Sequence, residues 1–212
     1  EPRTGETWLD PFCGSGLLLG ALTNHCAGDL RLFGIDRDPR VLNLARVECM
    51  LHHPTSEIQL LNANALQDTA GLLSDVGAPV DGVDGVVANP PFGAEVHDTD
   101  TDGYASFTLA NGKRTPLEVL GTEQCVRMLR PGGRMGIVLP QSVLSNRSQS
   151  PVRLFLLENC TIDGVLSLPG ETFQPFKGVS KASVLFLTKR SARPGSAVRL
   201  GVSRSVGWDA TG

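Results

Sequence analysis

Residues 7–18, TWLDPFCGSGLL, give the clearest indication of how this chain folds. A short apolar run, 7–9, leads into a turn that contains Gly14 and Gly16, and leucines with helical spacing follow. Glycine in such a turn lets the backbone approach a ligand closely at the N-terminus of a helix. The stretch therefore predicts a strand, a ligand-binding turn and a helix, which together open an α/β fold.

The rest of the chain alternates between apolar runs of strand length and stretches with helical spacing. This alternation is typical of βαβ units that build a parallel sheet. We predict an α/β fold of the Rossmann-like type, with a sheet of about seven strands and helices on both faces. The expected strands are 7–9, 30–35, 58–61, 82–88, 134–139, 162–168 and 182–188, and the expected helices are 17–26, 39–53, 115–129 and 152–159. Residues 93–113 are expected to form a polar functional loop, and 191–212, rich in Gly, Ser and Arg, a linker.

The glycine-rich turn favours one class of cofactor over another. The third glycine of a dinucleotide-binding G-x-G-x-x-G is absent, because Leu19 stands there and Gly20 comes one position late. Asp10 also places a carboxylate at the mouth of the turn, where it would repel a pyrophosphate. The same carboxylate suits a ligand with an ammonium group, such as the methionine end of S-adenosylmethionine. The turn therefore predicts S-adenosylmethionine rather than NAD.

Further polar residues follow the next two expected strands. Asp36 ends the second strand, where an acid commonly accepts hydrogen bonds from ribose hydroxyls. The alternative is that it supplies a negative charge to the start of the next helix. After the third strand, the amide of Asn64 is a candidate for the adenine ring, or it simply makes a turn. The predicted cofactor-binding residues are Asp10, Pro11, Phe12, Gly14, Gly16, Asp36, Arg37, Asn64, Ala65 and Asn89.

The tetrapeptide Asn89-Pro90-Pro91-Phe92 predicts the site of the chemistry. Its prolines stiffen an extended end to the fourth strand, beside the first strand at the expected switch point of the sheet. The Asn89 side-chain oxygen and the Pro90 carbonyl can accept the two hydrogens of an amino group that is conjugated to a ring. Such acceptors polarise the nitrogen and aim its lone pair at a methyl donor, while Phe92 can stack on the ring. All four residues are predicted to be catalytic.

Composition limits the remaining possibilities. Hydrophobic residues make up 41% and charged residues 19%, and no apolar run approaches the roughly 18 residues of a membrane helix. The five cysteines are scattered without a C-x-x-C pair, which argues against a metal site or a disulfide framework and for a cytoplasmic location. The net charge is −3, so any contact with DNA is expected to be local or shared with other segments.

These motifs together resemble the γ-type adenine-N6 DNA methyltransferases, especially the modification subunits of type I restriction-modification systems. Asp10–Gly16 resembles the cofactor motif of that family and Asn89–Phe92 its catalytic motif. The segment 129–140, LRPGGRMGIVLP, is similar to the fifth-strand segment, and 168–186 to the segment that holds the flipped base. The resemblance covers nearly the whole chain. It implies methyl transfer from S-adenosylmethionine to adenine in double-stranded DNA, with specificity and restriction subunits as possible partners.

The resemblance also assigns aromatic residues and domains. In such enzymes the target base leaves the helix and sits between aromatic faces. Phe92 would take one face and Phe173 the other, with Phe176 as the alternative for the second, although either could be core. Residues 1–190 would form the catalytic domain. By this resemblance, we expect the family's N-terminal helical domain, its target-recognition region and the segment upstream of the cofactor turn to lie outside this sequence.

Two other classes of function stay open. One is an N-methyltransferase that acts on an RNA amino group or on a protein glutamine, and the other is a non-catalytic module that binds a cofactor or a partner. Resemblance to the first class fades after the fourth strand, whereas that to the DNA enzymes continues from Leu129 to Lys189. The intact Asn89–Phe92 motif counts against the second class.

Overall fold

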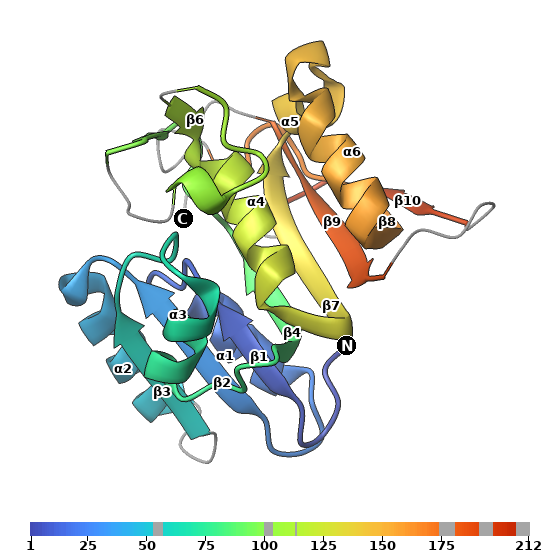
Figure 1. Cartoon of the computed structure of the whole chain (residues 1–212). Helices are drawn as coiled ribbons and strands as arrows, with labels where there is room; N and C mark the ends of the chain where they lie inside the picture. The colour runs from blue at the N-terminus through green and yellow to red at the C-terminus, as the bar shows by residue number, and fades with distance from the viewer. Residues whose placement is uncertain (53–56, 100–103, 113, 174–180, 191–196, 207–212) are drawn as a thin grey trace.

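An eight-stranded sheet runs through the computed structural model, which describes residues 1–52, 57–99, 104–112, 114–173, 181–190 and 197–206 (Figure 1). The strand order is β10-β8-β9-β7-β4-β1-β2-β3. The strands are β1 (Thr7–Asp10), β2 (Arg31–Asp36), β3 (Glu57–Asn62), β4 (Val83–Ala88), β7 (Leu129–Pro140), β8 (Cys160–Ser167), β9 (Ala182–Lys189) and β10 (Arg199–Val202). The predicted Rossmann-like α/β fold is confirmed, with one strand more than the seven expected.

The direction of the strands divides the sheet into two parts. β3, β2, β1, β4 and β7 are parallel neighbours, whereas β9 runs antiparallel to both β7 and β8. The chain moves outward from β1 to β2 and β3, and then returns to β4 on the other side of β1. This reversal is the topological switch point at which open α/β sheets bind ligands, beyond the carboxyl ends of the strands.

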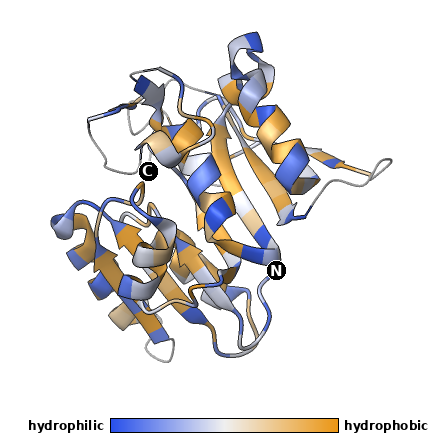
Figure 2. Cartoon of the chain, viewed as in Figure 1, coloured by the Kyte–Doolittle hydropathy of each residue, from blue (hydrophilic) through white to orange (hydrophobic). Residues whose placement is uncertain are grey.

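The helices cover both faces of the sheet because side chains alternate along each strand. On β1, Leu9 faces the larger core, under α3, α4 and α6, whereas Trp8 faces a second core under α1 and α2. Figure 2 shows the apolar strands between polar outer helix surfaces. The helices are α1 (Leu17–Asn24), α2 (Pro39–His52), α3 (Thr69–Val76), α4 (Leu117–Met128), α5 (Gln141–Ser145) and α6 (Ser150–Asn159). No described helix is both long and apolar enough to cross a bilayer.

The structure differs from the expected elements in three places. Helices α3 and α5 were not predicted. The stretch 93–113 contains β5 (Glu95–His97) and a 3₁₀ turn (Tyr104–Ser106), and β5 pairs with β6 (Arg114–Pro116) in a second, two-stranded sheet. Within the predicted linker, β10 pairs in parallel with β8 and forms the edge of the main sheet. The expected domain boundary at residue 190 therefore falls before the last strand.

Candidate functional site

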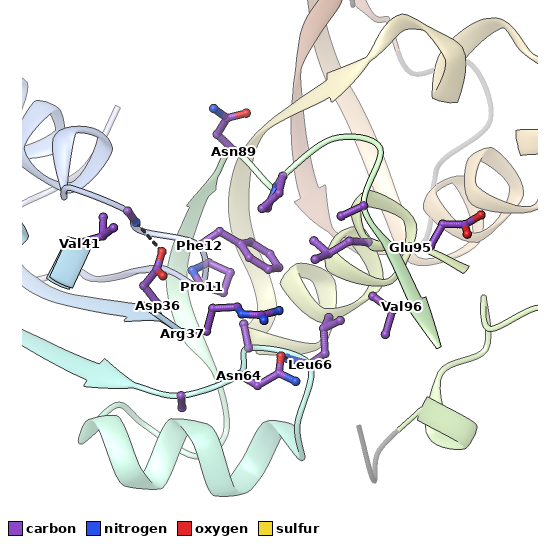
Figure 3. A pocket seen from close by; sticks show the side chains of 16 residues that line it. Pro11, Phe12, Asp36, Arg37, Val41, Asn64, Leu66, Asn89, Glu95 and Val96 are labelled. Atoms are coloured by element: carbon purple, nitrogen blue, oxygen red, sulfur yellow. Dashed lines mark hydrogen bonds between the residues drawn. The ribbon is translucent and has the colours of Figure 1, made fainter. Parts of the chain in front are cut away.

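A pocket of about 810 Å³ lies beyond the carboxyl ends of β1, β2, β3 and β4 (Figure 3). Its volume is in the usual range of small-molecule sites. The predicted residues that line it are Pro11, Phe12, Gly14, Asp36, Arg37, Asn64, Ala65, Asn89 and Pro91. The lining residues that were not predicted are Val41, Ala63, Leu66, Ala94, Glu95, Val96 and Leu117. The structure thus brings the candidate cofactor and acceptor motifs to one cavity.

Gly14 is the glycine of the turn that faces this pocket. Its φ of 52° lies in the left-handed region, which favours glycine. A Cβ built on it would have no atom of another part of the protein within 4 Å, so the space beside it is open. Its N–H donates to Oδ2 of Asp36 over 3.0 Å. The turn is therefore fixed to the end of β2 and presents backbone to the cavity.

Gly16 has a different environment from the one predicted. It does not line the pocket but caps α1 with a φ of 83°. A Cβ on Gly16 would lie 3.2 Å from the Cβ of Ala45 in α2, which is tighter than ordinary contact. In this structure, helix packing against Ala45 and the backbone conformation restrict side chains at Gly16.

Asp36 is the carboxylate that the fold holds most firmly at the pocket. Oδ2 accepts the N–H of Gly14, and Oδ1 accepts the N–H of Asp38 over 2.9 Å. Each carboxylate oxygen keeps lone-pair capacity for another donor. The side chain points into the pocket from the end of β2 (Figure 3). This arrangement is compatible with the prediction that Asp36 accepts hydrogen bonds from a pair of ligand hydroxyls.

Asp10 does not line the pocket, in contrast to the expectation that it stands at the mouth of the turn. Its side chain is buried, and Oδ1 accepts the N–H of Phe12 over 2.9 Å. Burial raises the pKa of this carboxyl to about 7, the Phe12 N–H opposes the rise, and the negative charge of Asp36 adds to it. Asp10 therefore stabilises the glycine-rich turn through a buried hydrogen bond.

This buried carboxyl predicts a pH-dependent stability. Because the folded pKa of about 7 lies above the ordinary 3.8, Asp10 favours folding below pH 4, and this contribution is lost as pH rises through 7. Asp10→Asn keeps an oxygen for the Phe12 N–H and removes the titration. We expect the variant to be more stable than the wild type by about 2–4 kcal/mol at pH 8, with little gain at pH 4. Urea unfolding across this range measures the difference, and parallel pH profiles would contradict the assignment.

Asn64 and its neighbours form the wall below Arg37 in Figure 3. The side-chain oxygen of Asn64 accepts the N–H of Leu66 over 3.1 Å, which is the turn that the sequence left as an alternative. The same residue lines the pocket, so its amide hydrogens are the groups that it can offer to a ligand. Both interpretations of Asn64 are compatible with this geometry.

The acceptor motif follows β4 without a break. Asn89 is exposed at the pocket, and its amide extends away from Phe12 (Figure 3). Pro90 is buried and does not line the cavity, whereas Pro91 does. This is the arrangement expected of a rigid extended segment that carries one polar side chain at its start.

The two candidate base-stacking rings contact each other. The rings of Phe92 and Phe173 lie 5.7 Å apart between centroids, at an interplanar angle of 72°. A planar base cannot lie between two rings that meet edge to face, so the predicted sandwich requires them to separate. Phe176, the alternative, lies outside the described residues.

One side of the pocket, which includes Leu66 and Val96, packs against a segment that is held by a buried carboxylate. The sequence analysis did not predict this carboxylate. Glu123 of α4 accepts the N–H groups of Thr108 and Leu109, both over 2.8 Å, and pairs with Arg127 at 2.7 Å. These contacts fix a segment whose apolar residues pack with two pocket residues, Leu66 and Val96. In the sequence, the signal for this role of Glu123 is its place in a predicted helix next to other polar residues, which the structure shows to be buried.

Comparison with known proteins gives a consistent family. The family model described as N-6 DNA Methylase matches residues 1–202. The methylase subunit of the type I restriction enzyme EcoEI from Escherichia coli is 25% identical over 202 residues, which cover 89% of this chain and 39% of that protein. The EcoKI methylase subunit from E. coli K12 is 29% identical over 207 residues, with 89% and 37% covered.

A solved structure is similar over the whole chain. It is a Listeria monocytogenes protein assigned as a class I S-adenosylmethionine-dependent methyltransferase, with a TM-score of 0.78 and 25% identity, and the match covers 100% of this chain and 62% of that one. The chain spans about two fifths of the length of the curated relatives described above.

Proposed function

This chain belongs to the N-6 DNA methylase family, and we propose that it forms the catalytic core of an enzyme that methylates the N6 amino group of adenine in DNA. The observation that carries the proposal is that Gly14, Asp36 and Asn89, the candidate donor and acceptor residues, line one pocket. The relatives that support it are methylase subunits of type I restriction enzymes.

The residues of the pocket fit S-adenosylmethionine, which supplies an electrophilic methyl group on a sulfonium. Asp36 would accept the ribose hydroxyls, because its carboxylate is aimed by two backbone N–H groups. Gly14 leaves open space beside the turn, and the amide of Asn64 would meet the edge of the adenine ring. Arg37, which extends between Phe12 and Asn64 in Figure 3, would pack against the same nucleoside.

The acceptor residues would act on an amino group. The Asn89 side-chain oxygen and the Pro90 carbonyl would each accept one hydrogen of the N6 amino group, which draws the nitrogen lone pair out of conjugation. Phe92 would stack on the base. Phe173 would take the opposite face once the contact between the two rings has opened, so base entry competes with this edge-to-face pair.

The substrate and partners follow from the relatives. A flipped adenine of double-stranded DNA is the proposed substrate, and specificity and restriction subunits are the proposed partners, because the related subunits belong to restriction enzymes. The five cysteines are free thiols, which supports a reducing cytoplasm. We take the catalytic domain to include β10.

The product of the reaction tests the proposal. The full-length protein, with its partner subunits, should introduce N6-methyladenine into plasmid DNA, as read by mass spectrometry of the nucleosides. A methylated cytosine, RNA base or glutamine would overturn the substrate. A protein that binds S-adenosylmethionine but methylates none of these would support the non-catalytic alternative.

A further inference from the structure

One side of helix α4 contacts both halves of the pocket. The donor half contains the glycine-rich turn and Asn64–Leu66, and the acceptor half contains the motif that begins at Asn89. Leu117, Gly121 and Gln124 are spaced four and three residues apart, so they lie along one side of the helix. Leu117 lines the pocket itself. The helix lies over β4 and β7 near the middle of the sheet, and most of its residues are buried (Figure 1). Because α4 lies next to the switch point, it contacts the segments that follow β1, β3 and β4.

Gly121 contacts the donor turn and the acceptor motif at the same time. A Cβ on this residue would lie 3.0 Å from Cζ of Phe12 and 3.4 Å from Cβ of Pro90. Phe12 belongs to the glycine-rich turn, and Pro90 follows Asn89. A side chain at Gly121 would therefore require the Phe12 ring to move by a few tenths of an ångström, and it would be in ordinary van der Waals contact with Pro90.

Gln124 holds the segment that follows β3. This residue is fully buried, its Nε2 donates to the carbonyl of Gln67 over 3.0 Å, and its Oε1 accepts from Oγ1 of Thr69 over 3.1 Å. These partners come directly after the pocket residues Asn64–Leu66. Both ends of a buried amide are thus used to fix the donor side of the cavity.

Glu118 holds the segment that follows the acceptor motif. Its buried carboxylate accepts the N–H of Gly93 over 3.3 Å, and Gly93 comes directly after Phe92. Burial raises the pKa of this carboxyl. Asn89–Phe92 is therefore fixed at its start by β4 and after its end by α4.

From these contacts we infer that α4 sets the distance between the donor and acceptor halves of the pocket, with Gly121, Gln124 and Glu118 as positioning residues. The inference rests on the proposed methyl transfer, because the two halves have these roles only in that reaction. Gly121 acts on both halves, Gln124 on the donor side and Glu118 on the acceptor side.

Gly121→Ala separates positioning from stability. Alanine raises helix propensity but crowds the Phe12 ring, so a purely structural role predicts that any loss of activity accompanies a loss of stability. The two effects on stability oppose each other, so we expect a melting temperature close to that of the wild type, with methylation reduced at least about tenfold because small misplacements of reacting groups are costly. Gly71→Ala is the matched control, because it adds the same methyl group to α3 with only the Asp68 side chain within 4 Å.

A second pair of variants in the full-length protein tests the division of roles. Gln124→Met should weaken S-adenosylmethionine binding about tenfold in calorimetry and leave kcat at saturating donor unchanged. Glu118→Met should lower kcat about tenfold and leave donor affinity unchanged, and Glu118→Gln, which keeps an acceptor oxygen for Gly93, should restore most of the rate.

Full activity of Gly121→Ala, or equal effects of Gln124→Met and Glu118→Met on both parameters, would overturn the inference. The proposed function fails separately. If the wild-type protein makes no N6-methyladenine, the reaction is wrong, while the effect of Gln124→Met on donor affinity is still measured directly.

Discussion

Asn89→Ala is expected to reduce DNA methylation by about 100-fold or more while the affinity for S-adenosylmethionine stays within about twofold of wild type. The residue is exposed at the pocket and its amide extends away from Phe12, so we expect its main interactions to be with the acceptor, although it was also predicted to contact the cofactor. The loss should therefore appear in kcat. Mass spectrometry of plasmid nucleosides gives the rate, and calorimetry of the full-length protein gives the donor affinity.

Two further variants sharpen this result. Asn89→Asp should be milder, because a carboxylate still accepts a hydrogen bond at the same position. Asn159→Ala removes an asparagine amide that donates within α6, to the carbonyl of Phe155, and should leave methylation unchanged. Undiminished N6-methyladenine with Asn89→Ala would refute the acceptor mechanism, whereas a parallel loss of donor affinity would place Asn89 in the cofactor site.

The sequence predicted the architecture well where side-chain pattern and strand order act together. Within the predicted strands, 32–35 and 85–88 are mostly buried on both faces of a parallel sheet, so they appear in the sequence as apolar runs. Parallel strands direct their carboxyl ends to one edge. Asp36 and Asn89, which end or follow such strands, therefore meet at the pocket although 53 positions separate them.

Elements that depend on tertiary contacts were missed. Strand β10 has four exposed residues, and its place in the sheet comes from pairing with β8 rather than from its own apolar pattern. The segment around Tyr104 and Phe107 has no periodicity, yet both side chains are buried because Glu123 fixes the backbone beside them. Helix α3 was also missed, although it could have been predicted from its caps, because Asp68 and Gly77 are typical residues at helix boundaries.

Residue types were predicted more successfully than their environments. Gly14 and Gly16 both need a left-handed backbone, but only Gly14 faces the pocket, because the start of α1 turns Gly16 toward α2. Asp10 and Asp36 are both acids at strand ends, yet burial separates the first from the cavity. The sequence does not show which way a side chain points at the end of a strand. That direction determines whether the residue stabilises the turn, as Asp10 does, or faces the pocket, as Asp36 does.

Asp36→Ala is expected to weaken the binding of S-adenosylmethionine by about 10- to 100-fold, since hydrogen bonds to a charged group contribute about 1.5–3 kcal/mol. The carboxylate would lose its contacts to the ribose, and the N–H groups of Gly14 and Asp38 would lose their acceptor. Asp36→Asn should restore little, because its NH₂ group would face one of these two donors. Asp38→Ala is the matched control, since that acid pairs with Arg40 and does not line the pocket.

The product S-adenosylhomocysteine distinguishes the two ways in which Asp36 could act. It has the same ribose as the donor but lacks the sulfonium charge. If Asp36 binds the ribose, calorimetry should show the same fold loss for both ligands in Asp36→Ala, so that their affinity ratio is unchanged. A loss confined to S-adenosylmethionine would mean that the carboxylate acts through charge, and equal affinity of wild type and variant for both ligands would remove Asp36 from the site.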